Sequence, residues 1–152
     1  MNPKSITEST VNILLVEDNP DHAELVIRSF ENHEIPNTIH QAHNGEEALD
    51  YLFHRGQYSD PLTAPRPNVI LLDLRLPRIS GLEVLKEIKH DEDLRKIPVV
   101  ILTTSEAEQD IARAYEYHAN SYLVKPVNFD KFSNLMEELG FYWLAWNHRP
   151  KI

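Results

Sequence analysis

Five side chains that could take part in one reaction lie at or just after the ends of apolar runs: Glu17, Asp18, Asp73, Thr103 and Lys125. The run Val69–Leu72, which leads into Asp73, holds four large apolar residues in succession. An unbroken run of this kind is typical of a strand buried on both faces of a parallel sheet. Because open α/β folds bind their ligands at the carboxyl edge of the sheet, Asp73 is expected at that edge.

The residue types of this set complement one another chemically. Three clustered carboxylates with no other neutralising group form a site for a hard divalent cation such as Mg²⁺. Such a cation bridges phosphoryl oxygens and screens the carboxylate that attacks them. An Asp can act as the nucleophile, while Lys125 supplies charge for the transferred group and the Thr103 hydroxyl can donate to one of its oxygens. The set therefore indicates phosphoryl transfer onto Asp73.

Taken singly, each residue also has a purely structural explanation. Acidic residues after a strand often cap the next helix, Thr is common at strand ends, and a Lys before Pro is usually solvated. Only the combination favours chemistry over structure.

The elements that must position these side chains alternate between strand and helix. Strands are predicted over residues 11–16, 38–42, 69–72, 97–102 and 121–124. Helices are predicted near residues 20–32, 45–53, 81–88, 106–118 and 129–139. This alternation favours a doubly wound α/β fold with five parallel strands. Right-handed crossovers then place all five carboxyl ends at one edge of the sheet.

Length and composition narrow the classes of protein. The 152 residues are enough for one domain with a sizeable core, and the absence of cysteine excludes disulfides and thiolate chemistry. A net charge of −9 argues against nucleic acid or anionic lipid as a partner. No apolar run approaches the length of a membrane span. We therefore expect a cytoplasmic protein that binds neither nucleic acid nor membrane.

Together these residues resemble the receiver domain of two-component response regulators, the CheY-like (βα)5 fold. The matching stretches are Val16–Asn19, Leu72–Leu74 with Pro77 and Gly81, Thr103-Thr104, and Lys125-Pro126. The intervals of 30 residues from Asp73 to Thr103 and 22 from Thr103 to Lys125 are usual for the family. The interval from Asp18 to Asp73 is longer than usual, which we interpret as an insertion at residues 56–67, where Pro, Ser and Asp residues predict a surface loop.

The resemblance implies a role for each matching position. Asp73 is the phosphoacceptor, and Mg²⁺ or Mn²⁺ is held by Asp18, by Asp73, by the backbone carbonyl of Arg75 and, through water, by Glu17. The remaining roles fall on four residues: Thr103 as the switch hydroxyl, Lys125 as the phosphate-pairing cation, Tyr122 as the switch aromatic, and Thr104 beside the phosphate. The Lys125-Pro126 bond is expected to be cis, as in relatives.

Two residues depart from the usual pattern of the family. Arg75 stands where many receivers carry Asn or Asp, and its guanidinium could alter the lifetime of the phosphoryl group. Thr104 stands where small residues are common, and its side chain could narrow access to the site.

The same resemblance defines the organisation of the chain. Residues 1–10 form a lead-in, residues 11–139 the receiver, and residues 140–152 an aromatic extension of the last helix with no output domain after it. Four residues of the extension are predicted to form an interface with a second copy or with the kinase: Phe141, Tyr142, Trp143 and Trp146. Packing of the extension on its own domain is the alternative.

The residue 56–67 segment and the aromatic extension resemble the homodimeric response regulators that are paired with cyanobacterial phytochromes. A light-regulated histidine kinase is then the expected phosphoryl donor, and the chain itself is not an enzyme beyond its own phosphotransfer and autodephosphorylation. Two alternatives stay open. One is a pseudo-receiver scaffold that works without phosphate, and the other is a haloacid-dehalogenase-like phosphohydrolase, whose second Asp is replaced here by Arg75.

Overall fold

Five parallel strands form a single sheet in the order β2-β1-β3-β4-β5. In the computed structural model, which describes residues 10–31, 37–104, 106–114, 119 and 121–138, these strands are β1 (Val11–Val16), β2 (Asn37–Ala42), β3 (Val69–Asp73), β4 (Val99–Thr103) and β5 (Ser121–Val124). The predicted doubly wound parallel sheet is therefore confirmed.

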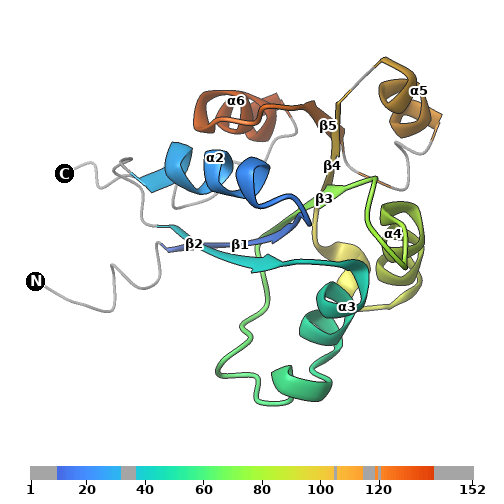
Figure 1. Cartoon of the computed structure of the whole chain (residues 1–152). Coiled ribbons are helices and arrows are strands. Elements are labelled where there is room, and N and C mark those ends of the chain that lie inside the picture. The colour runs from blue at the N-terminus through green and yellow to red at the C-terminus, as the bar shows by residue number, and fades with distance from the viewer. Residues whose placement is uncertain (1–9, 32–36, 105, 115–118, 120, 139–152) are drawn as a thin grey trace, which may run out of the picture.

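Helices cover both faces of the sheet. They are α2 (Pro20–Glu31), α3 (Gly45–Phe53), α4 (Gly81–His90), α5 (Glu106–Ala114) and α6 (Phe129–Glu138), with short 3₁₀ turns η1 (Gly56–Tyr58) and η2 (Leu94–Lys96). Figure 1 shows α2 and α6 on one side of the sheet and α3 and α4 on the other. The helix predicted over residues 106–118 is described as far as Ala114, and residues 115–118 lie outside the described part of the chain.

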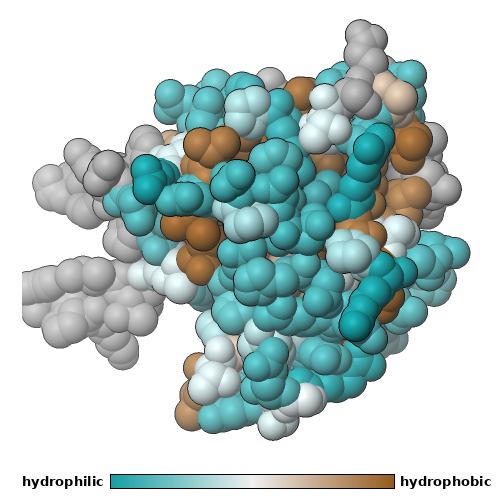
Figure 2. All heavy atoms as spheres, viewed as in Figure 1, coloured by the Kyte–Doolittle hydropathy of each residue, from teal (hydrophilic) through white to brown (hydrophobic). Residues whose placement is uncertain are grey.

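Alternate residues of the central strands enter two hydrophobic cores, one on each face. In β3, Ile70 and Leu72 join the cluster beneath α3 and α4, whereas Val69 and Leu71 join the cluster beneath α2 and α6. All four are fully buried, which is why the strand reads as an unbroken apolar run. The face in Figure 2 is mostly hydrophilic with small separate hydrophobic patches, and no helix in the described ranges is long and apolar enough to cross a membrane.

Strand β4 begins two residues later than the apolar run that predicts it. Residues Ile97 and Pro98 precede it, and Pro98 has no N–H to donate to a sheet ladder. Its carbonyl still accepts from the Ile70 N–H at 3.0 Å. The first two residues of the apolar run are therefore buried, but they precede the strand.

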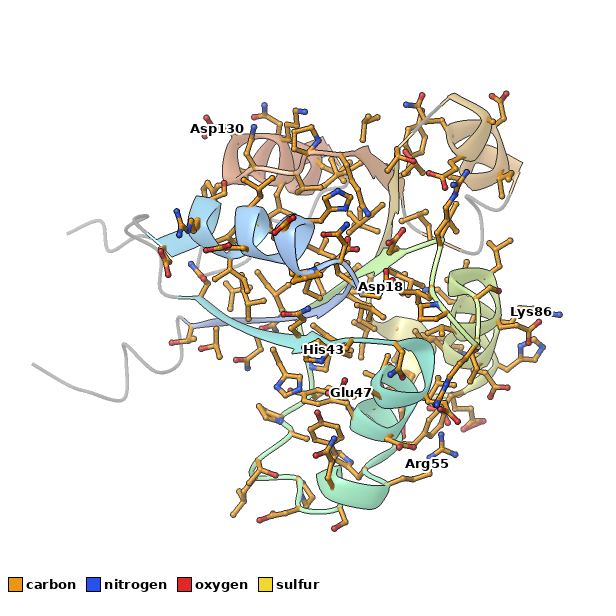
Figure 3. The ribbon with its side chains drawn as sticks, viewed as in Figure 1. Asp18, His43, Glu47, Arg55, Lys86 and Asp130 are labelled. Atoms are coloured by element: carbon orange, nitrogen blue, oxygen red, sulfur yellow. The ribbon has the colours of Figure 1, made fainter. Side chains whose placement is uncertain are left out.

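The prediction of a surface loop over residues 56–67 is wrong in part, since Tyr58, Ala64 and Pro67 are buried. The Tyr58 hydroxyl donates to Glu47 Oε2 at 2.5 Å, and its ring meets the His40 ring edge-on. Figure 3 labels Glu47 on α3, close to His43. Burial of an aromatic ring whose hydroxyl is hydrogen-bonded ties the segment to the domain.

Gly81 lets the start of α4 lie against the end of β3. A Cβ atom at this position would lie 2.2 Å from the carbonyl oxygen of Asp73 and 2.7 Å from Cα of Leu74. The Gly81 N–H donates to the Leu74 carbonyl at 3.1 Å, and the Ser80 hydroxyl caps the helix by accepting from the Glu83 N–H. The backbone that carries Asp73 is thus fixed by direct contact with α4.

We predict that Gly81→Ala lowers the free energy of unfolding by about 2 kcal/mol, because the new methyl group overlaps backbone atoms. Helix propensity alone predicts the opposite sign, since Ala is the better helix former. Urea denaturation measures the difference, and Glu87→Ala, at an exposed position of the same helix, is the control. A Gly81→Ala protein as stable as the wild type would contradict the close packing.

Candidate functional site

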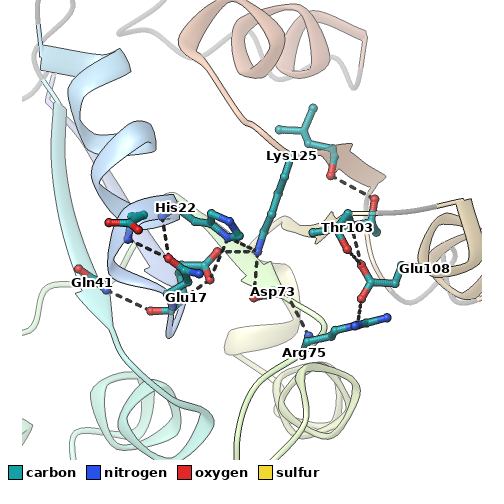
Figure 4. A network of polar contacts seen from close by, with 12 residues as sticks. Glu17, His22, Gln41, Asp73, Arg75, Thr103, Glu108 and Lys125 are labelled. Carbon is teal, nitrogen blue, oxygen red and sulfur yellow. Dashed lines mark hydrogen bonds and ion pairs between the residues drawn. The ribbon is translucent and has the colours of Figure 1, made fainter.

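The carboxyl edge of the sheet brings the predicted site residues together. Glu17 and Asp18 follow β1, Asp73 ends β3, Thr103 ends β4 and Lys125 follows β5. Carboxylate oxygens of Glu17, Asp18 and Asp73 lie within 4.8 Å of one another. Figure 4 shows Glu17, Asp73 and Lys125 converging from three different strand ends.

The Lys125 ammonium group neutralises two of these carboxylates. Its Nζ lies 2.9 Å from Glu17 Oε1 and 3.1 Å from Asp73 Oδ2. The Lys125 side chain is 10% exposed and that of Glu17 only 1%, so both charges are largely removed from water. Burying charges this way is costly unless each is paired and hydrogen-bonded, which these contacts achieve.

Burial raises the pKa of the Glu17 carboxyl from 4.5 to about 7, with the negative charge of Asp73 adding to the rise and Lys125 opposing it. Burial alone would lower the pKa of Lys125, but its bonds to Glu17 and Asp73 outweigh that effect and raise it. Because the folded-state pKa of Glu17 exceeds its ordinary value, its contribution to stability is complete below about pH 4.5 and is lost as the pH rises through about 7.

Backbone donors fix the acidic side chains. Asp73 Oδ1 accepts from the Arg75 N–H at 3.1 Å, and Glu17 Oε2 accepts from the Asn19 N–H at 3.2 Å. Asp18 is exposed, and Figure 3 places it beside the ends of the strands. The site thus combines two held carboxylates with one that faces solvent.

Thr103 and Tyr122, the two predicted switch residues, lie on the neighbouring strands β4 and β5. Thr103 is fully buried, and its hydroxyl donates a long 3.5 Å bond to the Leu123 carbonyl on the neighbouring strand. Its own carbonyl accepts from the Lys125 N–H at 2.8 Å. Tyr122 is half-buried and packs on the core beneath α3 and α4. The Lys125-Pro126 bond is cis, as predicted.

Two residues that contact the site, His22 and Glu108, are absent from the sequence predictions. His22 Nδ1 lies 3.1 Å from Lys125 Nζ and 3.9 Å from Glu17 Oε2. Glu108 on α5 is buried and contacts both Arg75 and Thr104, the two residues that depart from the family pattern. Neither is part of a sequence motif, and Glu108 lies in a stretch that reads as a polar, solvated helix.

A pocket of about 280 Å³ opens beside the acidic residues. Its walls are apolar, with Leu25 and Val26 of α2 on one side and Pro126 and Val127 after β5 on the other. Glu17, His22 and Lys125 also line it. Lys125 is therefore accessible from this pocket.

The donor set fits a divalent cation. Carboxylate oxygens are the ligands that hard cations prefer, and the three carboxylates here come close enough to share one ion. The exposed Asp18 gives such an ion a route in from solvent. A sheet-edge Asp with an acidic pair, a Thr and a Lys on neighbouring strand ends is the set of residues that the sequence predicts for a receiver domain.

Comparison with known proteins agrees with this class. The family model of the response regulator receiver domain matches residues 13–137. The chain therefore belongs to the response regulator receiver family and is a two-component response regulator.

Among curated proteins, the chain is 48% identical over 139 residues to the probable methanogenesis regulatory protein FilR2 of Methanothrix harundinacea, covering 91% of this chain and 86% of FilR2. It is 41% identical over 132 residues to response regulator Rcp1 of Synechocystis, covering 87% and 88% of the two chains. The solved structure of Rcp1 in its Mn²⁺-bound form aligns with a TM-score of 0.68 at 40% identity, over 90% of this chain and 94% of that one.

The bacteriophytochrome response regulator AtBRR is similar in structure as well. Its TM-score is 0.79 at 46% sequence identity, and the alignment covers 88% of this chain and 95% of AtBRR.

We predict that affinity for a divalent cation rises with pH, because Glu17 must lose its proton to contribute charge and its pKa is about 7. The apparent affinity should increase roughly tenfold between pH 6 and pH 8. Isothermal titration with Mn²⁺ measures it. Glu17→Gln should bind more weakly at pH 8 and lose most of the pH dependence, and an equally steep pH profile in that variant would disprove the role of Glu17.

Proposed function

We propose that the chain accepts a phosphoryl group on Asp73 from a histidine kinase in the cytoplasm, with Mg²⁺ or Mn²⁺ in the acidic site. The observation that carries this proposal is the position of Lys125 Nζ, 3.1 Å from Asp73 and 2.9 Å from Glu17. A lysine held there can pair with the Asp73 carboxylate before the transfer and with the phosphoryl group on Asp73 after it. Such a site stabilises an acyl phosphate without a catalytic base.

The transfer is a displacement at phosphorus. A carboxylate oxygen of Asp73 forms the new O–P bond while the P–N bond of a phosphohistidine breaks, and the histidine leaves with its electron pair and takes a proton from solvent. When bound, the cation supplies positive charge to the phosphoryl oxygens. The groups that would hold it are Asp18, Asp73, the Arg75 carbonyl and, through water, Glu17.

The chain's own residues orient this reaction. The Arg75 N–H fixes Asp73 Oδ1 at 3.1 Å, which leaves the other carboxylate oxygen directed toward Lys125. Lys125 then pairs with the transferred group as a point charge. The buried strand β3 keeps Asp73 from turning away while the phosphoryl group arrives.

Phosphorylation is proposed to act as a switch. The Thr103 hydroxyl leaves the Leu123 carbonyl for the phosphoryl group, and Tyr122 follows it inward, so that the surface of α5, β5 and α6 changes for a partner. We also propose that the receiver domain spans residues 11–139 and carries an insertion at 56–67. A homodimer through Phe141, Tyr142, Trp143 and Trp146 is a further proposal, and these four residues lie outside the described part of the chain.

Phytochrome-linked light signalling is the proposed input. Support comes from the likeness to AtBRR, which is described as a bacteriophytochrome response regulator, together with the likeness to Rcp1. FilR2, a probable methanogenesis regulatory protein, has a similar sequence too, so the phytochrome link rests on the likeness to AtBRR and Rcp1 and not on the receiver domain alone. The kinase that docks on the chain then determines the signal.

Wild-type protein should become phosphorylated by phosphoramidate or acetyl phosphate in the presence of Mg²⁺, because the site needs only a reactive donor and a cation. Asp73→Asn removes the nucleophile and should show no labelling, while Asp93→Asn, at an exposed position just before η2, should label like the wild type. Phosphate-affinity electrophoresis and intact mass measure the product. A folded wild type that takes no phosphate would favour the pseudo-receiver, and steady hydrolysis of phosphomonoesters would favour the phosphohydrolase.

Transfer from a phytochrome-linked histidine kinase should be fast and should depend on the light state of that kinase. The matched donor is a histidine kinase without a phytochrome module, tested at the same concentration. Initial rates of transfer to wild type and Asp73→Asn separate true transfer from background. Equal rates from both kinases in light and dark would contradict the phytochrome input.

A further inference from the structure

Glu108 is a buried carboxylate beside the site but separate from its acidic residues. Its side chain is 4% exposed although it belongs to the polar helix α5. Its Oε1 accepts from the Thr104 N–H at 2.6 Å and from the Thr104 hydroxyl at 2.5 Å, and its Oε2 pairs with Arg75 Nε. Figure 4 shows Glu108 between Arg75 and the end of β4.

The donors to Glu108 come from the two loops that leave the site. Arg75 follows Asp73 by two residues, and its N–H already holds Asp73 Oδ1. Thr104 directly follows Thr103, the last residue of β4. Glu108 therefore connects the loop after the phosphoacceptor to the loop after the switch hydroxyl.

This connection differs from an ordinary surface ion pair. Arg78 and Glu46 form a pair of the same residue types in which both side chains are more than half exposed, and such pairs contribute little. Glu108 is instead 4% exposed, although its partner Arg75 is 74% exposed, and the charge-assisted hydrogen bonds from Thr104 to a buried carboxylate are strong and costly to lose. The contacts of Glu108 therefore favour one conformation of Thr104.

In that conformation the Thr103 hydroxyl is directed to the neighbouring strand β5. The Thr103 hydroxyl bonds to the Leu123 carbonyl, so it must move to reach a phosphoryl group on Asp73. Any such movement also displaces the next residue, Thr104. The backbone N–H and the side-chain hydroxyl of Thr104 both donate hydrogen bonds to Glu108. A phosphoryl group would also offer anionic oxygens that compete with Glu108 for Arg75 and Thr104.

We propose that Glu108 is a positioning residue that holds the loop after β4 in its resting place and so opposes phosphorylation. The inference rests on the proposed phosphorylation of Asp73. Contacts made only in the resting conformation favour that conformation. They therefore raise the phosphoryl-donor concentration that is needed to populate the phosphorylated state. Arg75 and Thr104 contribute to the same restraint, because they are the partners that Glu108 contacts.

The test is the dependence of phosphorylation on phosphoramidate concentration in the presence of Mg²⁺, with the first-order loss of phosphate measured after donor removal. Glu108→Gln keeps the shape but removes the charge, and it should lower the half-saturating donor concentration roughly five- to tenfold. Glu46→Gln, which breaks the exposed pair with Arg78, is the matched control and should leave that concentration unchanged. Urea denaturation reports whether each variant is folded.

Arg75→Gln and Thr104→Ala keep the test open if Glu108→Gln does not fold, because both side chains are exposed. Each should lower the half-saturating concentration by roughly two- to threefold. The double variant Arg75→Gln/Glu108→Gln should gain less than the product of the two single effects, since both remove one contact.

A folded Glu108→Gln that needs as much donor as the wild type, or more, would overturn the inference, as would strictly multiplicative effects of Arg75→Gln and Glu108→Gln. A residue with a merely structural role would not make phosphorylation easier. A folded wild type without any label overturns the proposed function, and this inference with it. A labelled wild type with unchanged variants overturns this inference alone.

Discussion

A single ammonium group between two buried carboxylates is the interaction on which the site depends. Glu17, Asp18 and Asp73 offer oxygens within 4.8 Å of one another, an arrangement that repels itself without a cation. Lys125 supplies that cation at 2.9 and 3.1 Å from two of the three. The raised pKa of Glu17 follows first from its burial and then from the negative charge of Asp73, and a divalent cation in the site would offset that charge.

The fold makes this arrangement possible by separating a rigid part from a movable one. Strands β1 and β3 are buried in two cores and hold Glu17 and Asp73 at fixed positions, with Gly81 allowing α4 to press on the end of β3. The part proposed to move follows β4, where Glu108 connects Thr104 to Arg75. The proposed switch would convert charge at Asp73 into movement at α5 while the sheet stays in place.

Much of this could be predicted from the sequence, because buried parallel strands give apolar runs and place their last residues at one edge. The strands and the convergence of Glu17, Asp73 and Lys125 follow from that logic, whereas the family was indicated by the resemblance of these residues and their intervals to receiver domains. The start of β4 was missed because Pro98 continues the apolar run while lacking an N–H. The burial of Tyr58 and Glu108 was missed because each depends on a partner from a distant segment, Glu47 for one and Arg75 for the other. Periodicity within one helix carries no information about such partners.

The identity of the phosphorylated side chain tests the central claim most directly. Wild-type protein treated with phosphoramidate and Mg²⁺ can be reduced with borohydride, which converts an aspartyl phosphate to homoserine, and peptide mass spectrometry then locates the change. The account predicts homoserine at position 73 and at no other carboxylate. Modification at Asp18 or Glu17, or none in a folded protein, would contradict it.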